Sequence, residues 1–325
     1  MNKSRRVDMS TAPNTSVKIL EDVIFVVLTY KQEKYIPQTL LSTFNQTCFP
    51  SKLIIMDDAS PDNTDKAIRE LISQAPEKLN IEYWHNDVNV GLVGQLNKLV
   101  GKFENKLIVL QAGDDESYPH RLEETYKAWL ANNKPSLLLA NHDDIDNHGN
   151  ITKPFDSKSK PEKPYTLKRI INRRSKVYGC CAAYDSDLIN FFGKIPENVI
   201  NEDRVNVFRA YFRNGISYLH KPLIKYRSDV GISAFDTNTP EKQHHRMVTE
   251  AKRELADIDS HIIDLYKIEQ SDANSLLLKR KISATWLSTL PKNLSVFDVI
   301  RALLNGVSFR TAVRTFKKMN KKKKH

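Results

Sequence analysis

The sequence predicts an α/β fold in which a mostly parallel, doubly wound sheet is flanked by helices and followed by an α-helical C-terminal extension. Short apolar runs alternate with helical segments between about residues 22 and 132, the pattern of parallel sheets with crossover helices. Three of the runs end in polar, acidic or glycine-bearing loops, and such sheets bind ligands at the carboxyl ends of their strands. From Glu241 onward the pattern is helical. We therefore expect a disordered lead-in at 1–20, one α/β domain at 21–240 and a helical extension at 241–325.

The apolar runs of the first half are short and uninterrupted, which favours strands buried on both faces. The run 23–28 is rich in β-branched residues. Pro37 lies in the first turn of the helix expected after it, where proline is tolerated. We expect strands at 23–28, 53–56, 81–84 and 107–110. We expect helices at 36–44, at 92–103 and at 121–132, and a further helix that follows the loop 57–64 and ends at about 74.

The second half of the α/β domain has a less regular pattern. We expect strands at 137–140, 177–184, 216–219 and 223–226, helices at 167–172, 187–192 and 204–213, and a mobile loop at 152–164. Residues 144–155 begin like a calcium loop, but Phe155 stands where such a loop needs a bidentate Glu. We therefore interpret 147–150 as a tight turn that closes a hairpin.

Composition and charge exclude several classes of protein. The net charge of +11 is concentrated at the end of the chain, because residues 310–325 hold eight Lys or Arg and no acid. This favours a basic appendage over a surface that coats nucleic acid. Cys48, Cys180 and Cys181 lack the spacing of a zinc site and suggest a reducing compartment. Residues 1–16 lack the apolar core of a signal peptide, and no apolar run of about eighteen residues predicts a membrane span.

Asp114 and Asp115 are the first candidates for chemistry. They follow the strand expected at 107–110 and the small-residue turn Ala112-Gly113. Paired hard oxygens at such a place can hold Mg²⁺ or Mn²⁺, which in turn grips a diphosphate. The alternative is a solvated turn with a helix cap at Ser117. The pair alone does not decide between these interpretations.

Five short motifs follow one another at compatible spacings. They are Thr29-Tyr30-Lys-Gln-Glu33, Leu41-Ser42-x-x-x-Gln46-Thr47, Ile55-Met-Asp57-Asp58-Ala-Ser-x-Asp62-Asn-Thr64, Asn89-x-Gly91, and Ala112-Gly-Asp114-Asp115 followed by Pro119-x-Arg121-Leu122. Each motif is weak when taken alone. Together, over about residues 22–235, the series resembles the family 2 glycosyltransferases, whose GT-A fold is a Rossmann-like sheet flanked by helices.

The resemblance implies a nucleotide-sugar donor bound together with a divalent metal, Mg²⁺ or Mn²⁺. It places Thr29 and Tyr30 at the nucleotide base, with Glu33 nearby. It also places Asp57 or Asp58 at the base edge, and we favour Asp58 because it lies further out of the strand.

The same resemblance gives Asn89 and Gly91 a place in the loop that lines this pocket. Asp114 and Asp115 match the acidic metal-binding motif, with Asp115 the better ligand. The family often has Asp where this chain has Ala112. Fewer ligands then come from the protein, and we expect metal and nucleotide to bind together.

A second acidic motif, Asn201-Glu202-Asp203, matches the position of the family's Glu-Asp motif, whose Asp acts as the base. We favour Asp203 as the base, with Glu202 as the competing candidate. The alternative is a carboxylate that only stabilises a helix N-terminus. Arg227 belongs to a Tyr-Arg pair that resembles one often found near the end of the domain, and Asp229 stands where many members have His.

The resemblance implies an inverting glycosyltransferase. Its donor would be a UDP- or dTDP-linked sugar, and its acceptor a hydroxyl of a glycan or lipid-linked glycan in cell-surface polysaccharide biosynthesis, for capsule or O-antigen. A nucleotidyltransferase is one alternative, but the loop 29–33 lacks the Gly-rich, basic sequence that such an enzyme needs. A non-enzymatic membrane-surface or nucleic-acid binder that uses the basic tail is the other.

The segment 296–319 has apolar residues at helical spacing, among them Val296, Ile300, Leu303 and Val307, and cationic residues opposite. Such a segment can lie on an anionic membrane surface, or its apolar face can pack on the domain. We expect peripheral contact of residues 296–325 with the cytoplasmic face of the inner membrane, a cytoplasmic location and no nucleic-acid partner. Homo-oligomer contact through the extension is left open.

Overall fold

The computed structural model describes residues 17–228, 230 and 239–320. Most of the expected lead-in at 1–20, Asp229 and the lysines 321–324 therefore lie outside the described residues. The strands are β1 (Lys18–Thr29), β2 (Cys48–Asp57), β3 (Ile81–His85), β4 (Leu107–Ala112), β5 (Glu116–Ser117), β6 (Leu137–Ile145), β7 (Ile151–Lys153), β8 (Ala182–Asp185) and β9 (Ile216–Arg227).

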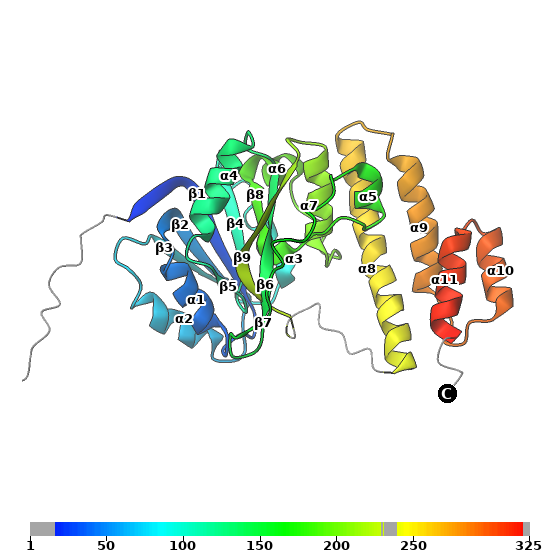
Figure 1. The fold of residues 1–325 in the computed structure, drawn as a ribbon, viewed down its shortest axis with the longest axis horizontal. Helices are drawn as coiled ribbons and strands as arrows, with labels where there is room; N and C mark the ends of the chain where they lie inside the picture. Colours follow the sequence, from blue (N-terminus) through cyan, green and yellow to red (C-terminus); the bar gives the residue numbers. More distant parts are fainter. Residues whose placement is uncertain (1–16, 229, 231–238, 321–325) are drawn as a thin grey trace, which may run out of the picture.

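Helices cover the sheet and continue beyond it as the C-terminal extension (Figure 1). They are α1 (Ile36–Phe44), α2 (Thr64–Ile72), α3 (Gly91–Asn97), α4 (Arg121–Ala131), α5 (Leu167–Ile171), the 3₁₀ helix η1 (Gly179–Cys181), α6 (Ser186–Phe192), α7 (Glu202–Tyr211), α8 (Pro240–Lys267), α9 (Asn274–Ser288), α10 (Val296–Leu304) and α11 (Phe309–Asn320).

Across the described residues the strands form one nine-stranded sheet in the order β3-β2-β1-β4-β8-β6-β9-β5, with β7 paired to β6. The first half is parallel: β1 pairs with β2 and β4, and β2 pairs with β3. The pairs β4–β8, β6–β8, β5–β9 and β6–β7 are antiparallel. The sheet is thus mixed, whereas the sequence indicated a mostly parallel one.

The register of the parallel strands aligns the carboxyl ends of β1, β2, β3 and β4. Thr29 at the end of β1 lies opposite Asp57 at the end of β2, and Leu28 lies opposite Ala112 at the end of β4. Asp57 in turn lies opposite His85 at the end of β3. The carboxyl ends of four neighbouring strands therefore form one edge, which is where such a sheet binds ligands.

The core lies on both faces of the sheet. Along β1, Ile24, Val26 and Leu28 pack into one cluster with helices that include α7 and α8. Phe25 and Val27 point the other way and pack with α1, α2 and α4. This alternation explains the uninterrupted apolar sequence of β1, because a strand buried on both faces needs apolar residues at every position.

Two segments of the second half differ from the expectation. The predicted strands 216–219 and 223–226 form one continuous strand, β9, whose pairing with β6 shifts register beside Pro222. The predicted strand 177–184 begins only at Ala182, because Gly179–Cys181 forms η1 instead. The expected turn at 147–150 does close a hairpin between β6 and β7, where the Asp146 carboxylate accepts hydrogen bonds from the backbone of His148 and Asn150.

The extension packs on the α/β domain through α8. Arg209 of α7 donates two hydrogen bonds to Asp264 of α8, at 2.8 and 3.1 Å, and both side chains are buried. α9 packs against α8, and α10 and α11 form a helical hairpin at the end of the molecule farthest from β3 (Figure 1). In the part of the chain that the structure describes, no helix is long and apolar enough to cross a membrane.

Candidate active site

The carboxylates of Asp114 and Asp115 are almost fully buried just beyond β4. One oxygen of Asp115, Oδ1, accepts a 2.9 Å hydrogen bond from the backbone N–H of Arg227. The other, Oδ2, is buried without a hydrogen-bond partner among the described residues. Burial, and for Asp115 also the charge of Asp114, raises the pKa of both carboxyl groups. A divalent cation would remove this electrostatic cost, so the donor set fits Mg²⁺ or Mn²⁺.

Arg227 is one of the largest fully buried side chains. Its Nε donates to the backbone carbonyl of Asp114 at 2.9 Å, its Nη1 donates to the carbonyl of Asp146, and Glu116 lies 3.5 Å away. The guanidinium also stacks over the ring of Tyr35, 4.6 Å from its centroid. In this structure Arg227 holds the acidic loop in place, and contact with a nucleotide sugar stays a prediction.

Thr29 and Gln32 face the same acidic loop. Thr29 Oγ1 and Gln32 Oε1 are both buried, and neither has a hydrogen-bond partner within 17–228, 230 and 239–320. A Cβ atom on Gly113 would lie 2.2 Å from Gln32 Oε1 and 2.7 Å from Thr29 Cβ, so only glycine fits there. Tyr30 is 38% exposed at the mouth of this region. Gln32 was missed at the sequence level, although it stands within the first motif.

The Asp58 carboxylate is used to hold the loop that contains Asn89 and Gly91. It accepts hydrogen bonds from the backbone N–H of Val90 at 2.8 Å and of Gly91 at 2.7 Å, and from Asn86 Nδ2 at 2.8 Å. Asn89 Nδ2 donates to the Asp58 carbonyl at 3.2 Å. The predicted neighbours are therefore brought together, and Asp58 shapes this loop; its contact with a base is untested.

Glu33 connects two loops of the same edge. Its carboxylate accepts hydrogen bonds from the backbone N–H of Asn63 at 2.9 Å and from Asn63 Nδ2 at 3.0 Å. The neighbouring Gln32 N–H donates to Thr64 Oγ1 at 2.9 Å. The first and third sequence motifs thus form one hydrogen-bonded unit at the ends of β1 and β2.

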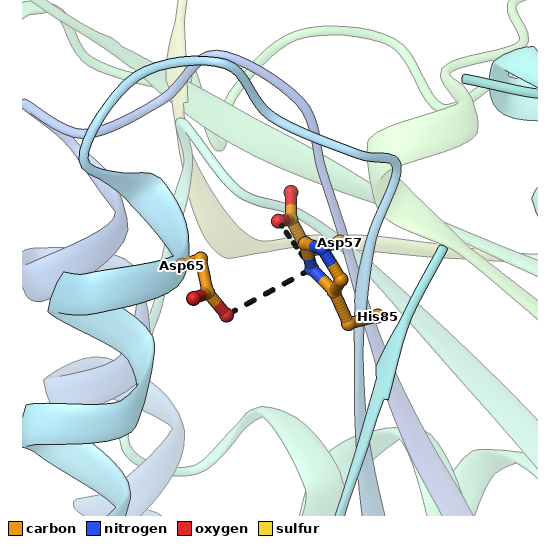
Figure 2. A group of neighbouring side chains, drawn as sticks. All are labelled: Asp57, Asp65 and His85. Carbon is orange, nitrogen blue, oxygen red and sulfur yellow. Dashed lines mark hydrogen bonds and ion pairs between the residues drawn. The ribbon is translucent and has the colours of Figure 1, made fainter. Parts of the chain in front are cut away.

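Asp57 belongs to a second polar cluster, with Asp65 and His85 (Figure 2). His85 Nδ1 lies 3.1 Å from Asp57 Oδ2 and 3.8 Å from Asp65 Oδ1. One ligand atom from each residue lies within 4.8 Å of the others, so the cluster could hold a cation. Asp65 and His85 were not predicted as site residues, because the place of His85 at the sheet edge depends on β3 pairing with β2.

The two carboxylate groups differ in how their charge is balanced. Arg69 donates to both oxygens of Asp65 at 2.9 and 3.1 Å, and His85 lies between Asp57 and Asp65. No comparable cation contacts the unpartnered Asp115 oxygen in the described part of the chain. Asp114 and Asp115 are therefore the better candidates to hold a metal ion.

Glu202 and Asp203 form a third acidic group in the first turn of α7. A Cβ atom on Gly179 would lie 2.7 Å from Glu202 Oε1, so Glu202 lies directly against η1. Burial, and then the charge of Asp203, raises the pKa of Glu202 to about 8. Burial also raises the pKa of Asp203, whose Oδ1 accepts a 2.7 Å hydrogen bond from the N–H of Arg204.

The helix η1 links the two acidic pairs. Buried Arg121 donates to the carbonyl of Cys180 at 3.1 Å, to Ser117 Oγ at 2.9 Å and to the carbonyl of Leu110. The same short helix therefore contacts the end of β4 through Arg121 and contacts Glu202 through Gly179. Cys180 and Cys181 pack within this link.

The extension reaches the second acidic pair through Asp257 of α8. Asn201 precedes α7 but does not cap it; its Nδ2 donates to Asp257 Oδ2 at 3.1 Å. Arg173 donates to the same oxygen. Asp257 is 2% exposed, and burial raises its pKa to about 6. A residue of the extension thus holds the N-terminus of the helix that carries Glu202 and Asp203.

Comparison with known proteins identifies the family. The sequence model described as glycosyl transferase family 2 matches residues 24–192, just over half of the chain. An uncharacterized glycosyltransferase of Methanocaldococcus jannaschii is 35% identical over 150 residues, which are 46% of this chain and 49% of the relative. One of Haemophilus influenzae is 30% identical over 102 residues, 31% of each chain. The chain thus spans half or less of the length of these curated relatives.

Two solved structures resemble the fold over most of the chain. Residues 1–349 of S. aureus TarS, in complex with UDP-GlcNAc, have a TM-score of 0.56 at 20% identity, covering 91% of this chain and 92% of that fragment. The mannosyltransferase PcManGT from Pyrobaculum calidifontis, in complex with GDP-Man and Mn²⁺, has a TM-score of 0.54 at 15% identity, covering 97% and 84%. The chain therefore belongs to glycosyl transferase family 2, and its fold is the GT-A fold.

Proposed function

We propose that this protein is an inverting glycosyltransferase that moves a sugar from a UDP- or dTDP-linked donor to a hydroxyl of a glycan or lipid-linked glycan in cell-surface polysaccharide biosynthesis. The observation that carries the proposal is the placement of two buried carboxylate pairs around η1. Burial raises the pKa of the acids in both pairs, but of the two pairs only Asp114–Asp115 has a buried oxygen without a partner among the described residues. The first suits a metal-bound diphosphate, and the second suits proton transfer.

Asp114 and Asp115 would hold Mg²⁺ or Mn²⁺, and Asp115 Oδ2 is the atom that lacks a protein partner. The bound ion would neutralise the negative charge that grows on the departing diphosphate. The complexes of TarS with UDP-GlcNAc and of PcManGT with GDP-Man and Mn²⁺ support a nucleotide-sugar donor and a metal. Both likenesses are to the fold alone, and the UDP- or dTDP-linked donor is the one that the family resemblance implies.

The edge formed by β1, β2 and β4 would bind the nucleotide. Thr29 and Tyr30 would meet the base, and Glu33 would keep their loop in place through Asn63. Asp58 would shape the pocket wall, because its carboxylate fixes the loop that ends at Gly91. A donor held in this way is oriented before the acceptor arrives, which lowers the entropic part of the barrier.

Asp203 would act as the general base. Glu202 has a pKa of about 8 and is therefore mostly protonated near neutral pH, which leaves Asp203 as the carboxylate of the pair. Asp203 is half-buried and is the more accessible of the two, whereas Glu202 is buried against Gly179. Attack by that hydroxyl from the face opposite the diphosphate would invert the anomeric centre.

The test is Asp203→Asn, with transfer followed for a defined donor and acceptor. We expect kcat to fall roughly 100- to 10,000-fold, the typical contribution of a general base, while UDP binding is retained. Asp187→Asn is the matched control, because Asp187 is also an acidic residue in the first turn of a helix, α6, and lies on the surface. Full transfer rates in Asp203→Asn would show that another group is the base.

Two alternatives from the sequence are set aside. A nucleotidyltransferase and a non-enzymatic binder both conflict with membership of the glycosyltransferase family. A role for the basic end of the chain survives as part of the proposal: residues 296–325 would bring the enzyme to an anionic membrane surface, on the cytoplasmic side, where a lipid-linked acceptor is found. No nucleic-acid partner is proposed.

A further inference from the structure

The C-terminal segment is folded differently from the single amphipathic helix that its sequence suggests. It forms two helices, α10 and α11, with a break at Gly306, whose φ is +83°. Ala302, Val307 and Ala312 are buried between the helices and pack on Ile282 and Trp286 of α9. Val307, which was expected on an apolar face that could meet a membrane, is therefore part of the hairpin's own core.

A different set of apolar side chains points outward. Val296, Phe297, Ile300 and Leu304 are 59%, 83%, 47% and 82% exposed. Because an α-helix repeats every 3.6 residues, these four positions share one face of α10. Phe309, the first residue of α11, is 71% exposed as well. We call these five exposed residues, four on one face of α10 and one at the start of α11, the apolar face of the hairpin.

The charges beside the apolar face are almost all positive. Arg301, Arg310, Arg314, Lys317 and Lys318 are exposed cations on α10 and α11. Asp298 is the only acid between residues 295 and 320, and its carboxylate is engaged in a capping box with Ser295. The lysines 321–324 follow in the sequence.

We propose that the α10–α11 hairpin docks on the surface of an anionic phospholipid bilayer, with Phe297, Leu304 and Phe309 inserted and the cations of α11 at the headgroups. This rests on, and sharpens, the membrane contact proposed above, because it names which side chains insert. Large exposed apolar residues next to clustered cations are the chemistry of interfacial membrane helices. Figure 1 shows the hairpin at the end of the molecule away from the sheet, where a flat surface can reach it.

A second copy of this chain is the less favourable occupant. Two hairpins that met through their apolar faces would bring together two sets of five exposed cations with only one acid in each. Like charges at an interface oppose association, whereas an anionic bilayer attracts them. Charge complementarity therefore selects the lipid surface.

The experiment is vesicle co-sedimentation of the full-length protein, with phosphatidylcholine vesicles that either contain or lack phosphatidylglycerol. We expect binding to the anionic vesicles only. Phe297→Ser/Leu304→Ser should reduce binding at least tenfold, although all cations remain. Tyr266→Ser is the matched control, because Tyr266 is 77% exposed on α8 and outside the hairpin. Arg314→Gln/Lys317→Gln should weaken binding by about fivefold per cation removed.

Three outcomes would overturn the proposal. If Phe297→Ser/Leu304→Ser and the unmodified protein bound equally well to anionic vesicles, the basic tail alone would account for the binding. Equal binding to neutral and anionic vesicles would remove the charge argument. Concentration-dependent dimerisation that Phe297→Ser/Leu304→Ser abolishes, without vesicle binding, would identify a second copy as the occupant. None of these readouts depends on sugar transfer, so the proposed function is tested separately, by the transfer assay of Asp203→Asn.

Discussion

Replacing Glu202 by Gln should stabilise the protein at alkaline pH. Glu202 is 7% exposed, and burial followed by the charge of Asp203 raises its pKa from 4.5 to about 8. Glutamine has the shape and the neutral charge of the protonated acid, so Glu202→Gln keeps the favoured form at every pH.

The direction and size follow from proton linkage. Between pH 4.5 and 8 the folded state holds a proton on Glu202 that the unfolded state has released. The free energy of unfolding therefore falls as pH rises through this window. One pKa unit corresponds to about 1.36 kcal/mol, so the fall at pH 8 and above is at most about 5 kcal/mol. Glu202→Gln removes this fall, so its advantage in unfolding free energy over the unmodified protein should grow as pH rises above 4.5 and level off above about pH 8.

Urea unfolding followed by circular dichroism at pH 5, 7 and 9 measures the effect. The difference in unfolding free energy between Glu202→Gln and the unmodified protein should grow with pH and reach several kcal/mol at pH 9. Glu197→Gln is the control, since Glu197 is exposed. A difference that is constant over pH, or that shrinks as pH rises, would refute the idea that Glu202 is buried as the neutral acid.

Three further perturbations test other parts of the site. Asp115→Asn removes the charge from the unpartnered buried oxygen and should weaken Mn²⁺-dependent UDP binding, measured by calorimetry, by at least about tenfold. Unchanged affinity would mean that the metal binds elsewhere, and Asp65→Asn would then test the cluster of Asp57, Asp65 and His85. Asp257→Asn weakens the contacts of Asp257 with Asn201 and Arg173 and should lower kcat roughly 10- to 100-fold with an unchanged donor KM. Asp257→Glu should restore part of the lost kcat, and a change in KM alone would argue against a role of Asp257 in positioning α7. Asp58→Asn weakens three hydrogen bonds that hold the loop at Gly91 and should lower the free energy of unfolding by about 2–3 kcal/mol. An unchanged midpoint in urea unfolding would contradict the idea that the Asp58 carboxylate holds this loop.

The first half of the fold could be predicted because its strands are continuous apolar runs. The predicted runs 23–28, 53–56 and 107–110 all lie inside observed parallel strands. Their polar ends were recognisable as one edge, since parallel strands place their carboxyl ends together. The place of the acidic pairs 57–58 and 114–115 at this edge could therefore be predicted from the local sequence and from the parallel topology.

The rest depends on contacts between residues far apart in the chain. His85 joins Asp57 only because β3 pairs with β2 in a particular register. Arg173 and Asp257 are 84 residues apart and meet through the packing of α8 on α7. The break at Gly306 divides a segment whose apolar spacing, taken alone, gave one helical face. Such features need the tertiary structure, because no local pattern specifies them.

The measurement that tests the central proposal most directly is nucleotide release from a panel of UDP-, dTDP- and GDP-linked sugars, with Mn²⁺ and with a chelator. The account predicts release from a UDP- or dTDP-linked sugar, strongly reduced by chelation and by Asp115→Asn. No release from any nucleotide sugar, or release that is indifferent to chelator and to Asp115→Asn, would contradict it.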